Sequence, residues 1–121
     1  MSFSARVRQK GQVSLVDLSG HLTSFETSGL RDTISGLLKQ GRNNIILNLS
    51  GLKYLDSSGI GELARNYMTV IKRSGVMKVV GLTPKIEEIL KITQLHQIFQ
   101  EFSDEEAALR SFPQSLNKKD L

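Results

Sequence analysis

Two adjacent serines at the centre of the sequence are the side chains best placed to do chemistry, within the segment Asp56-Ser57-Ser58-Gly59-Ile60-Gly61. The residues that follow have the spacing of a helix, so this segment occupies its first turn. Backbone amides there lack internal partners and the helix dipole is positive, which stabilises an anion or a phosphate on a serine. The segment therefore predicts either a modifiable serine or a well-capped helix, because Asp, Ser and Gly are also common at helix starts.

The helical spacing after Ser57 also predicts which side chains of this helix are available to a partner. The face expected to be buried, with Ser57 at its edge, carries Ile60, Leu63, Ala64, Tyr67 and Ile71. The side chains expected to face solvent are Ser58, Glu62, Arg65 and Thr69, with Met68 near the Ser57 edge. A glycine inside a helix costs up to ~1 kcal/mol relative to alanine. Gly61, one turn after Ser57, therefore predicts the close approach of a partner.

Other chemistries that a serine could serve lack their required companions. A serine hydrolase would need a glycine where Leu55 stands and a histidine base in a recognisable motif. The two histidines, His21 and His96, lie in no such motif. The chain has no cysteine and no paired-ligand spacing, which excludes a thiolate metal site and argues against any metal centre. We therefore expect no catalytic residue, no metal site and no cofactor.

The composition is that of an ordinary globular domain. The 121 residues are 39% hydrophobic and 23% charged, which suits one domain with its own core. The net charge is +4, but the basic residues are scattered and form no stripe, so we expect no nucleic-acid partner. No stretch approaches the ~18 apolar residues of a membrane helix, and the N-terminus does not resemble a signal peptide. These features predict a cytoplasmic protein with no membrane association.

Strands and helices are expected to alternate around the central segment. The predicted strands cover residues 3–9, 12–19, 45–49, 77–81 and 98–102, with a loop at 50–55. The predicted helices begin at a Thr23–Glu26 capping box, at the Asp56 segment, at Thr83 before Pro84, and at a Ser103–Glu106 capping box. Gly41 and Gly75 are expected to end the first two helices. A hairpin followed by this alternation predicts an α/β fold, with a mixed sheet of about five strands covered by about four helices.

The stretch from Ile45 to Gly61, IILNLSGLKYLDSSGIG, resembles the hallmark of STAS domains and is most similar to that of the bacterial anti-sigma factor antagonists. By element order the resemblance runs over residues 3–112 and includes the turn at 20–23 and the helix entry at 81–84. It implies the STAS fold for a domain at residues 1–112, followed by a polar C-terminal tail at 113–121.

The resemblance also implies a switch and its partners. In this family a serine kinase that is itself the anti-sigma factor phosphorylates the first serine after the aspartate, which corresponds to Ser57, with Ser58 as a minor candidate. The unmodified antagonist binds the anti-sigma factor and frees a sigma factor for transcription. The phosphorylated form does not bind, and a PP2C-type phosphatase restores it. The implied protein is a monomer or weak dimer, and its partner-binding residues are expected to be Thr23, Asp56, Ser57, Ser58, Gly59, Gly61, Glu62, Arg65 and Met68.

Two observations leave alternatives open. Many antagonists carry an aspartate where this chain has Thr23, a difference that bears on kinase recognition and on the identity of the partner. A second interpretation is therefore a STAS subunit that is not phosphorylated and serves as a scaffold in a larger signalling or transport complex. A third is an enzymatic or nucleotide-hydrolysing role, for which the sequence offers no independent sign.

Overall fold

The computed structural model describes residues 2–24 and 27–113, which form five strands, four α-helices and one short 3-10 helix. In chain order these are β1 (Phe3–Lys10), β2 (Val13–Leu22), α1 (Thr27–Lys39), β3 (Asn44–Leu55), α2 (Ser57–Lys72), β4 (Val76–Val80), α3 (Pro84–Ile92), η1 (Leu95–Gln97), β5 (Gln100–Phe102) and α4 (Glu105–Arg110). Of the predicted C-terminal tail, only Pro113 falls within the described residues.

The strands form one mixed sheet in the order β1-β2-β3-β4-β5. The hairpin of β1 and β2 is antiparallel, and its turn contains Gly11 with φ +61°. The pairs β2–β3, β3–β4 and β4–β5 are all parallel, because a helical connection returns the chain to the same end of the sheet each time. The predicted α/β fold with its mixed sheet is confirmed.

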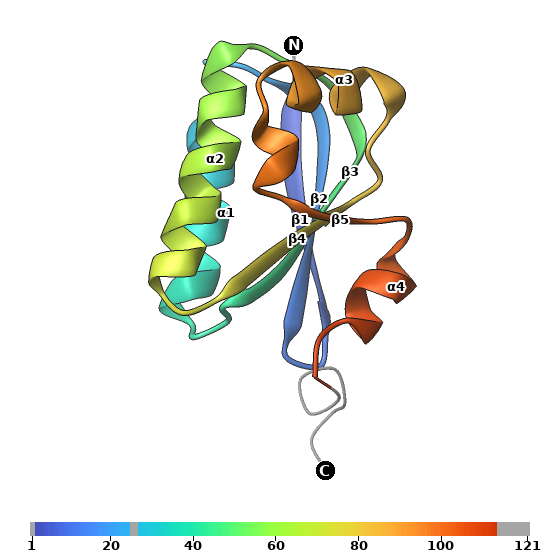
Figure 1. Ribbon diagram of the computed structural model, residues 1–121. Helices are drawn as coiled ribbons and strands as arrows, with labels where there is room; N and C mark the ends of the chain where they lie inside the picture. Colours follow the sequence, from blue (N-terminus) through green and yellow to red (C-terminus); the bar gives the residue numbers. More distant parts are fainter. Residues whose placement is uncertain (1, 25–26, 114–121) are drawn as a thin grey trace.

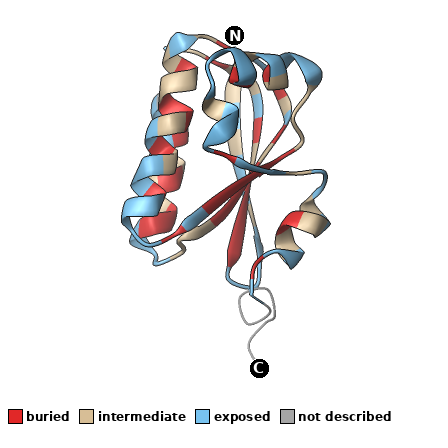
Figure 2. Cartoon of the chain, viewed as in Figure 1, coloured by how far each residue is buried: buried red, intermediate tan, exposed pale blue. Residues whose placement is uncertain are grey.

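Helices cover both faces of the sheet, so the sheet supplies two cores. The helices α1 and α2 lie side by side on one face, while α4 lies against the other (Figure 1). The larger core includes Leu30 of α1, Leu63 of α2 and Leu90 of α3. The smaller core, under α4, comprises Val13, Leu15, Ile46, Val80, Ala108 and Phe112. Successive residues of a strand point to opposite faces, which is why β2 and β3 are buried along most of their length (Figure 2).

The prediction of a loop at residues 50–55 was wrong, because β3 continues without interruption to Leu55. β2 also runs further than predicted, to Leu22, and the two strands stay paired through register shifts between Asp17 and Ser19 and between Gly20 and His21. A Cβ at Gly51 would lie 2.9 Å from Cβ of Ser19, so this pairing brings the two backbones close. The extension delivers the residue after β3, Asp56, to the far end of the sheet.

Several predicted helix boundaries also need correction. Asp104, not Ser103, caps α4, and its side chain accepts a hydrogen bond from the amide of Ala107 at 2.8 Å. The predicted last strand is shorter, because η1 precedes it and β5 begins only at Gln100. α2 ends at Lys72, and Ser74 adopts the left-handed conformation expected of Gly75.

Two predicted helix starts had different outcomes. The prediction for Thr83 is confirmed, since its hydroxyl accepts a hydrogen bond from the amide of Ile86 at 3.3 Å. The capping box of Thr23 and Glu26 lies partly outside the described residues, and α1 begins at Thr27. Within the described ranges, no helix combines the length and apolar character needed to cross a membrane. The same ranges contain no group of three or more His, Cys, Asp or Glu side chains arranged to hold a metal ion.

Candidate functional site

Asp56 fixes the start of α2 by bonding to the backbone on both sides. Its Oδ1 accepts a hydrogen bond from the amide of Gly59 at 2.9 Å, which makes it the N-cap of the helix. Its Oδ2 accepts one from the amide of Ser24 at 3.3 Å, and its own amide donates to the carbonyl of Leu22. Asp56 therefore ties the segment after β2, which contains Thr23, to the first turn of α2.

The helix start is pressed against the end of β2, and this contact requires a glycine. A Cβ at Gly59 would lie only 2.1 Å from the carbonyl oxygen of Leu22. Gly59 is accordingly buried, so its part in the site is to permit this approach. Ser57, the first residue of α2, is exposed, whereas Ser58 is half-buried and does not face solvent as fully as predicted.

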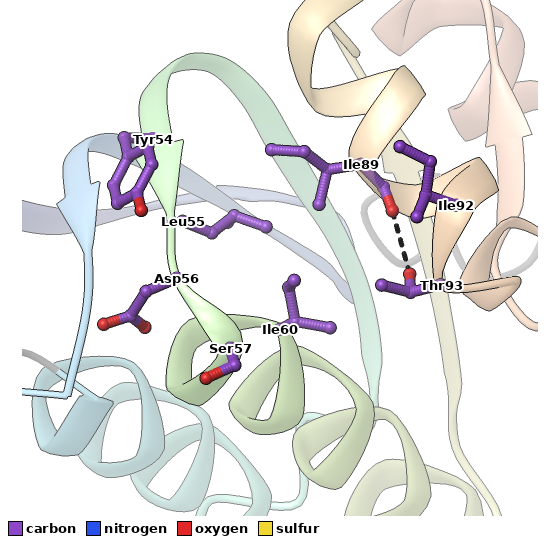
Figure 3. A pocket seen from close by; sticks show the side chains of 8 residues that line it. All are labelled: Tyr54, Leu55, Asp56, Ser57, Ile60, Ile89, Ile92 and Thr93. Carbon is purple, nitrogen blue, oxygen red and sulfur yellow. Dashed lines mark hydrogen bonds between the residues drawn. The ribbon is translucent and has the colours of Figure 1, made fainter.

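A pocket of about 380 Å³ opens beside Ser57, between the end of β3, the start of α2 and the end of α3 (Figure 3). Its lining consists of Tyr54, Leu55, Asp56, Ser57, Ile60, Ile89, Ile92 and Thr93. Asp56 and Ser57 lie on one side of this pocket and Ile89 and Ile92 of α3 on the other, with Ile60 of α2 next to Ser57. Ile92 is 74% exposed, an unusual state for so apolar a side chain. The α3 contribution was missed, because an isoleucine at the end of a helix carries no sequence signal of exposure.

Glu62, predicted to face solvent, is buried and only 1% exposed. Its carboxylate accepts hydrogen bonds from Nε and Nη2 of Arg31, at 3.1 and 3.2 Å, and from Nη2 of Arg65 at 3.1 Å. Nδ2 of Asn66 donates a further bond to Oε2 at 3.0 Å. We call Arg31, Glu62, Arg65 and Asn66 the Glu62 cluster. Sequence reasoning could not find Arg31, since it comes from α1 and meets α2 only in the folded chain.

The bonds within the Glu62 cluster set the charge of its carboxylate. Burial alone would raise the pKa of Glu62, but the hydrogen bonds from Arg31, Arg65 and Asn66 outweigh it and lower the pKa below its usual value. The hydrogen bonds that Arg31 donates to Glu62 also raise the pKa of Arg31. Glu62 therefore stays ionised beside two guanidinium groups.

The buried face of α2 is rotated from the predicted one. Leu63 and Val70 are buried as part of the core, but Ile71, predicted to be buried, is 40% exposed. Tyr67 is half-buried and packs edge-on against Phe99, with ring centroids 5.4 Å apart. The rotation follows from α1, which packs against α2 and covers the side that carries Glu62.

The predicted site residues fall into two groups along the molecule. Thr23, Asp56 and Ser57 lie together, because Asp56 joins the segment after β2 to α2. Met68 is exposed but follows Ser57 by eleven residues, which places it about 16 Å further along the helix axis. Met68 therefore lies apart from Ser57, and Arg65 lies between them.

These features define a small α/β domain that presents an exposed serine at a capped helix start, next to a partly apolar pocket. The chain belongs to the STAS domain family, whose model matches residues 4–108. It is 26% identical over 110 residues to an anti-sigma F factor antagonist from Paenibacillus polymyxa, an alignment that covers 90% of this chain and 94% of that protein.

Solved structures share the fold. An anti-sigma factor antagonist from Mycobacterium paratuberculosis superposes with a TM-score of 0.80 at 24% identity, covering 91% of this chain and 93% of that one. The Bacillus cell fate determinant SpoIIAA in its phosphorylated form gives a TM-score of 0.68 at 22% identity, covering 92% of this chain and all of the other.

Proposed function

We propose that this chain is an anti-sigma factor antagonist, a protein-binding module controlled by phosphorylation of Ser57. One observation carries the proposal: an exposed serine opens α2 beside a pocket, in a STAS chain similar over 90% of its length to an anti-sigma factor antagonist. In its unphosphorylated form the chain binds an anti-sigma factor and so frees a sigma factor. It acts by binding and catalyses no reaction itself.

The geometry of the helix start supports Ser57 as the acceptor. Its side chain is exposed, so a kinase can reach the hydroxyl, whereas Ser58 is half-buried. A phosphate at the first helical residue is stabilised by the helix dipole and nearby amides. The folded domain therefore tolerates the modification, and its effect falls on binding instead of on stability.

The pocket beside Ser57 supports this surface as the place where the partner binds. Tyr54 and Ile92 are exposed apolar side chains at its edge, and the Asp56 carboxylate lies at the same edge as Ser57. A phosphate would add about 1.5 to 2 negative charges beside Asp56. An unpaired charge desolvated in an interface costs several kcal/mol, and a penalty of ~3 kcal/mol lowers affinity more than a hundredfold.

The partners in this proposal are an anti-sigma factor that is a serine kinase and a PP2C-type phosphatase that removes the phosphate. Both act on the surface formed by Thr23, Asp56, Ser57 and the pocket. The module corresponds to residues 1–112, and its place of action is the cytoplasm, where sigma factors work.

Intact-mass measurement tests the proposal directly. The purified chain is incubated with a candidate anti-sigma factor kinase and ATP, alongside Ser57→Ala and Ser58→Ala variants. One added phosphate on the parent and on Ser58→Ala, and none on Ser57→Ala, is the expected result. If the chain forms a stable complex with the candidate anti-sigma factor but gains no phosphate, control by phosphorylation would be overturned and a scaffold subunit favoured instead.

Binding of the phosphorylated form completes the test. Calorimetry with the same anti-sigma factor should show at least a hundredfold weaker affinity after phosphorylation. Equal affinities before and after phosphorylation would contradict control of binding by Ser57.

A further inference from the structure

The Glu62 cluster holds two cations for one anion, and its cations are exposed. The side chains of Arg31 and Arg65 are 57% and 68% exposed, whereas that of Glu62 is 1% exposed. The cluster therefore shows solvent a surplus of positive charge, and its negative charge is hidden beneath. Because Glu62 accepts hydrogen bonds from both guanidinium groups, the fold itself holds these two positive charges next to each other.

The guanidinium of Arg65 lies over Gly61, one helical turn from Ser57. Helical side chains tilt toward the N-terminus, so the side chain of Arg65 extends back along α2. A Cβ at Gly61 would meet Nη2 of Arg65 at 3.7 Å. Gly61 lies one turn after Ser57, and positions so spaced have Cβ atoms about 6 Å apart. A larger side chain at position 61 would occupy the space between Arg65 and Ser57, which the glycine leaves open.

We infer that Arg65 is the counter-ion of a phosphate on Ser57, an inference that rests on the proposed phosphorylation of that serine. Arginine binds phosphate well because its planar guanidinium offers several N–H donors in a fixed arrangement. When Arg65 turns to the phosphate, Glu62 keeps its bonds to Arg31 and Asn66. The buried carboxylate therefore remains paired in both states.

The same cluster favours Ser57 over Ser58 as the phosphorylated residue. Glu62 follows Ser58 by one helical turn, so a phosphate on Ser58 would lie next to a buried carboxylate. Like charges at this spacing destabilise a helix, whereas opposite charges stabilise it. Gly61, at the corresponding spacing from Ser57, has a guanidinium beside it.

A titration of the phosphate tests Arg65 directly. Phosphoserine is installed at position 57 during synthesis of the full chain, so the experiment does not depend on finding the kinase. Phosphorus NMR then gives the second pKa of the phosphate in the parent and in Arg65→Gln. A nearby cation favours the doubly charged phosphate, so Arg65→Gln should raise this pKa by about half a unit or more.

Arg31→Gln is the matched control, because it removes an arginine from the same carboxylate but not one that lies over Gly61. It should shift the phosphate pKa by less than half as much as Arg65→Gln, and thermal unfolding confirms that both variants fold. Equal shifts in the two variants, or none in Arg65→Gln, would overturn the inference. Failure of every candidate kinase to modify Ser57 would instead count against the proposed function, and this titration would still report on Arg65.

Discussion

Among residues 2–24 and 27–113, two clusters built around a glutamate can be compared, and they have opposite net charge. The Glu62 cluster joins α1 to α2 and combines one carboxylate with two guanidinium groups. The second cluster, which we call the Glu105 cluster, joins β1, β2, β3 and α4 through Arg8, Asp17, Asn48 and Glu105. There a single guanidinium serves two carboxylates.

The difference in composition separates a structural cluster from a responsive one. In the Glu105 cluster, Arg8 donates to Asp17 twice, both at 2.8 Å, and also to Glu105. Hydrogen bonds from Arg8 lower the pKa of Glu105, and the bonds that Arg8 donates to Asp17 and Glu105 raise the pKa of Arg8. The guanidinium of Arg8 is shared between Asp17 of β2 and Glu105 of α4, so it links the hairpin to α4. In the Glu62 cluster either arginine can leave the carboxylate without leaving it unpaired, so this cluster can respond to a new anion.

The largest expected effect comes from removing each glutamate. Glu62→Ala should lower the free energy of unfolding by about 3 kcal/mol, because it leaves Asn66 and two guanidinium groups around a buried gap. Glu105→Ala should cost only about 1 kcal/mol, since Glu105 is 29% exposed and water can replace its bonds. Urea unfolding measures both values. A larger cost for Glu105→Ala would reverse the comparison.

For the arginines, we expect the opposite order: substitution in the Glu105 cluster should cost more stability than substitution in the Glu62 cluster. Arg8→Gln should lower the free energy of unfolding by about 1 kcal/mol, because Asp17 and Glu105 both lose the guanidinium that bonds to them and the Arg8 side chain is 41% exposed. Arg65→Gln should cost less than about 0.5 kcal/mol, since Arg31 still pairs with Glu62. If urea unfolding gives equal losses of stability for the two variants, the ratio of cations to carboxylates in a cluster does not decide how much each arginine stabilises the fold.

The helix caps next to the two clusters allow a finer comparison. Asp56 accepts from the amides of Gly59 and Ser24, whereas Asp104 accepts from that of Ala107. Asp56→Ala should therefore cost about 1 kcal/mol and Asp104→Ala about 0.5 kcal/mol. Asp56→Asn is the control and should keep most of the stability, because asparagine caps helices as well as aspartate does. A large loss in Asp56→Asn would show that the charge of Asp56, and not its cap, is what matters.

The smallest expected difference lies in the response to acid. The pKa values of Glu62 and Glu105 are both below their usual range in the folded protein, so both groups stabilise the fold above their unfolded pKa. This stability is lost as pH falls through the folded pKa. Between about pH 7 and pH 3, the midpoint temperature of thermal unfolding should fall less steeply for Glu62→Gln and for Glu105→Gln than for the parent. If the midpoint of either variant falls with pH as steeply as that of the parent, that glutamate does not contribute to the acid sensitivity of the fold.

The site was predictable where it depends on residues close in the chain. Asp56, Ser57 and Gly59 follow one another, and the first turn of a helix has the same geometry wherever it occurs. The prediction that Ser57 opens a capped helix needed no knowledge of the rest of the fold, whereas the greater exposure of Ser57 than of Ser58 was not predicted. Similarly, the hairpin and the alternation of strands and helices came from periodicities of two and 3.6 residues.

The sequence alone determined the order of the elements, the mixed sheet and the place of Ser57 at the start of α2. Only the tertiary structure decided that Glu62 is buried, that Ile71 is exposed and that α3 completes the pocket. Periodicity shows that a helix has a buried face, but that face is set by whichever element packs on it. Here α1, through Arg31, covers the side of α2 that a wheel drawn from hydrophobic residues alone assigns to solvent.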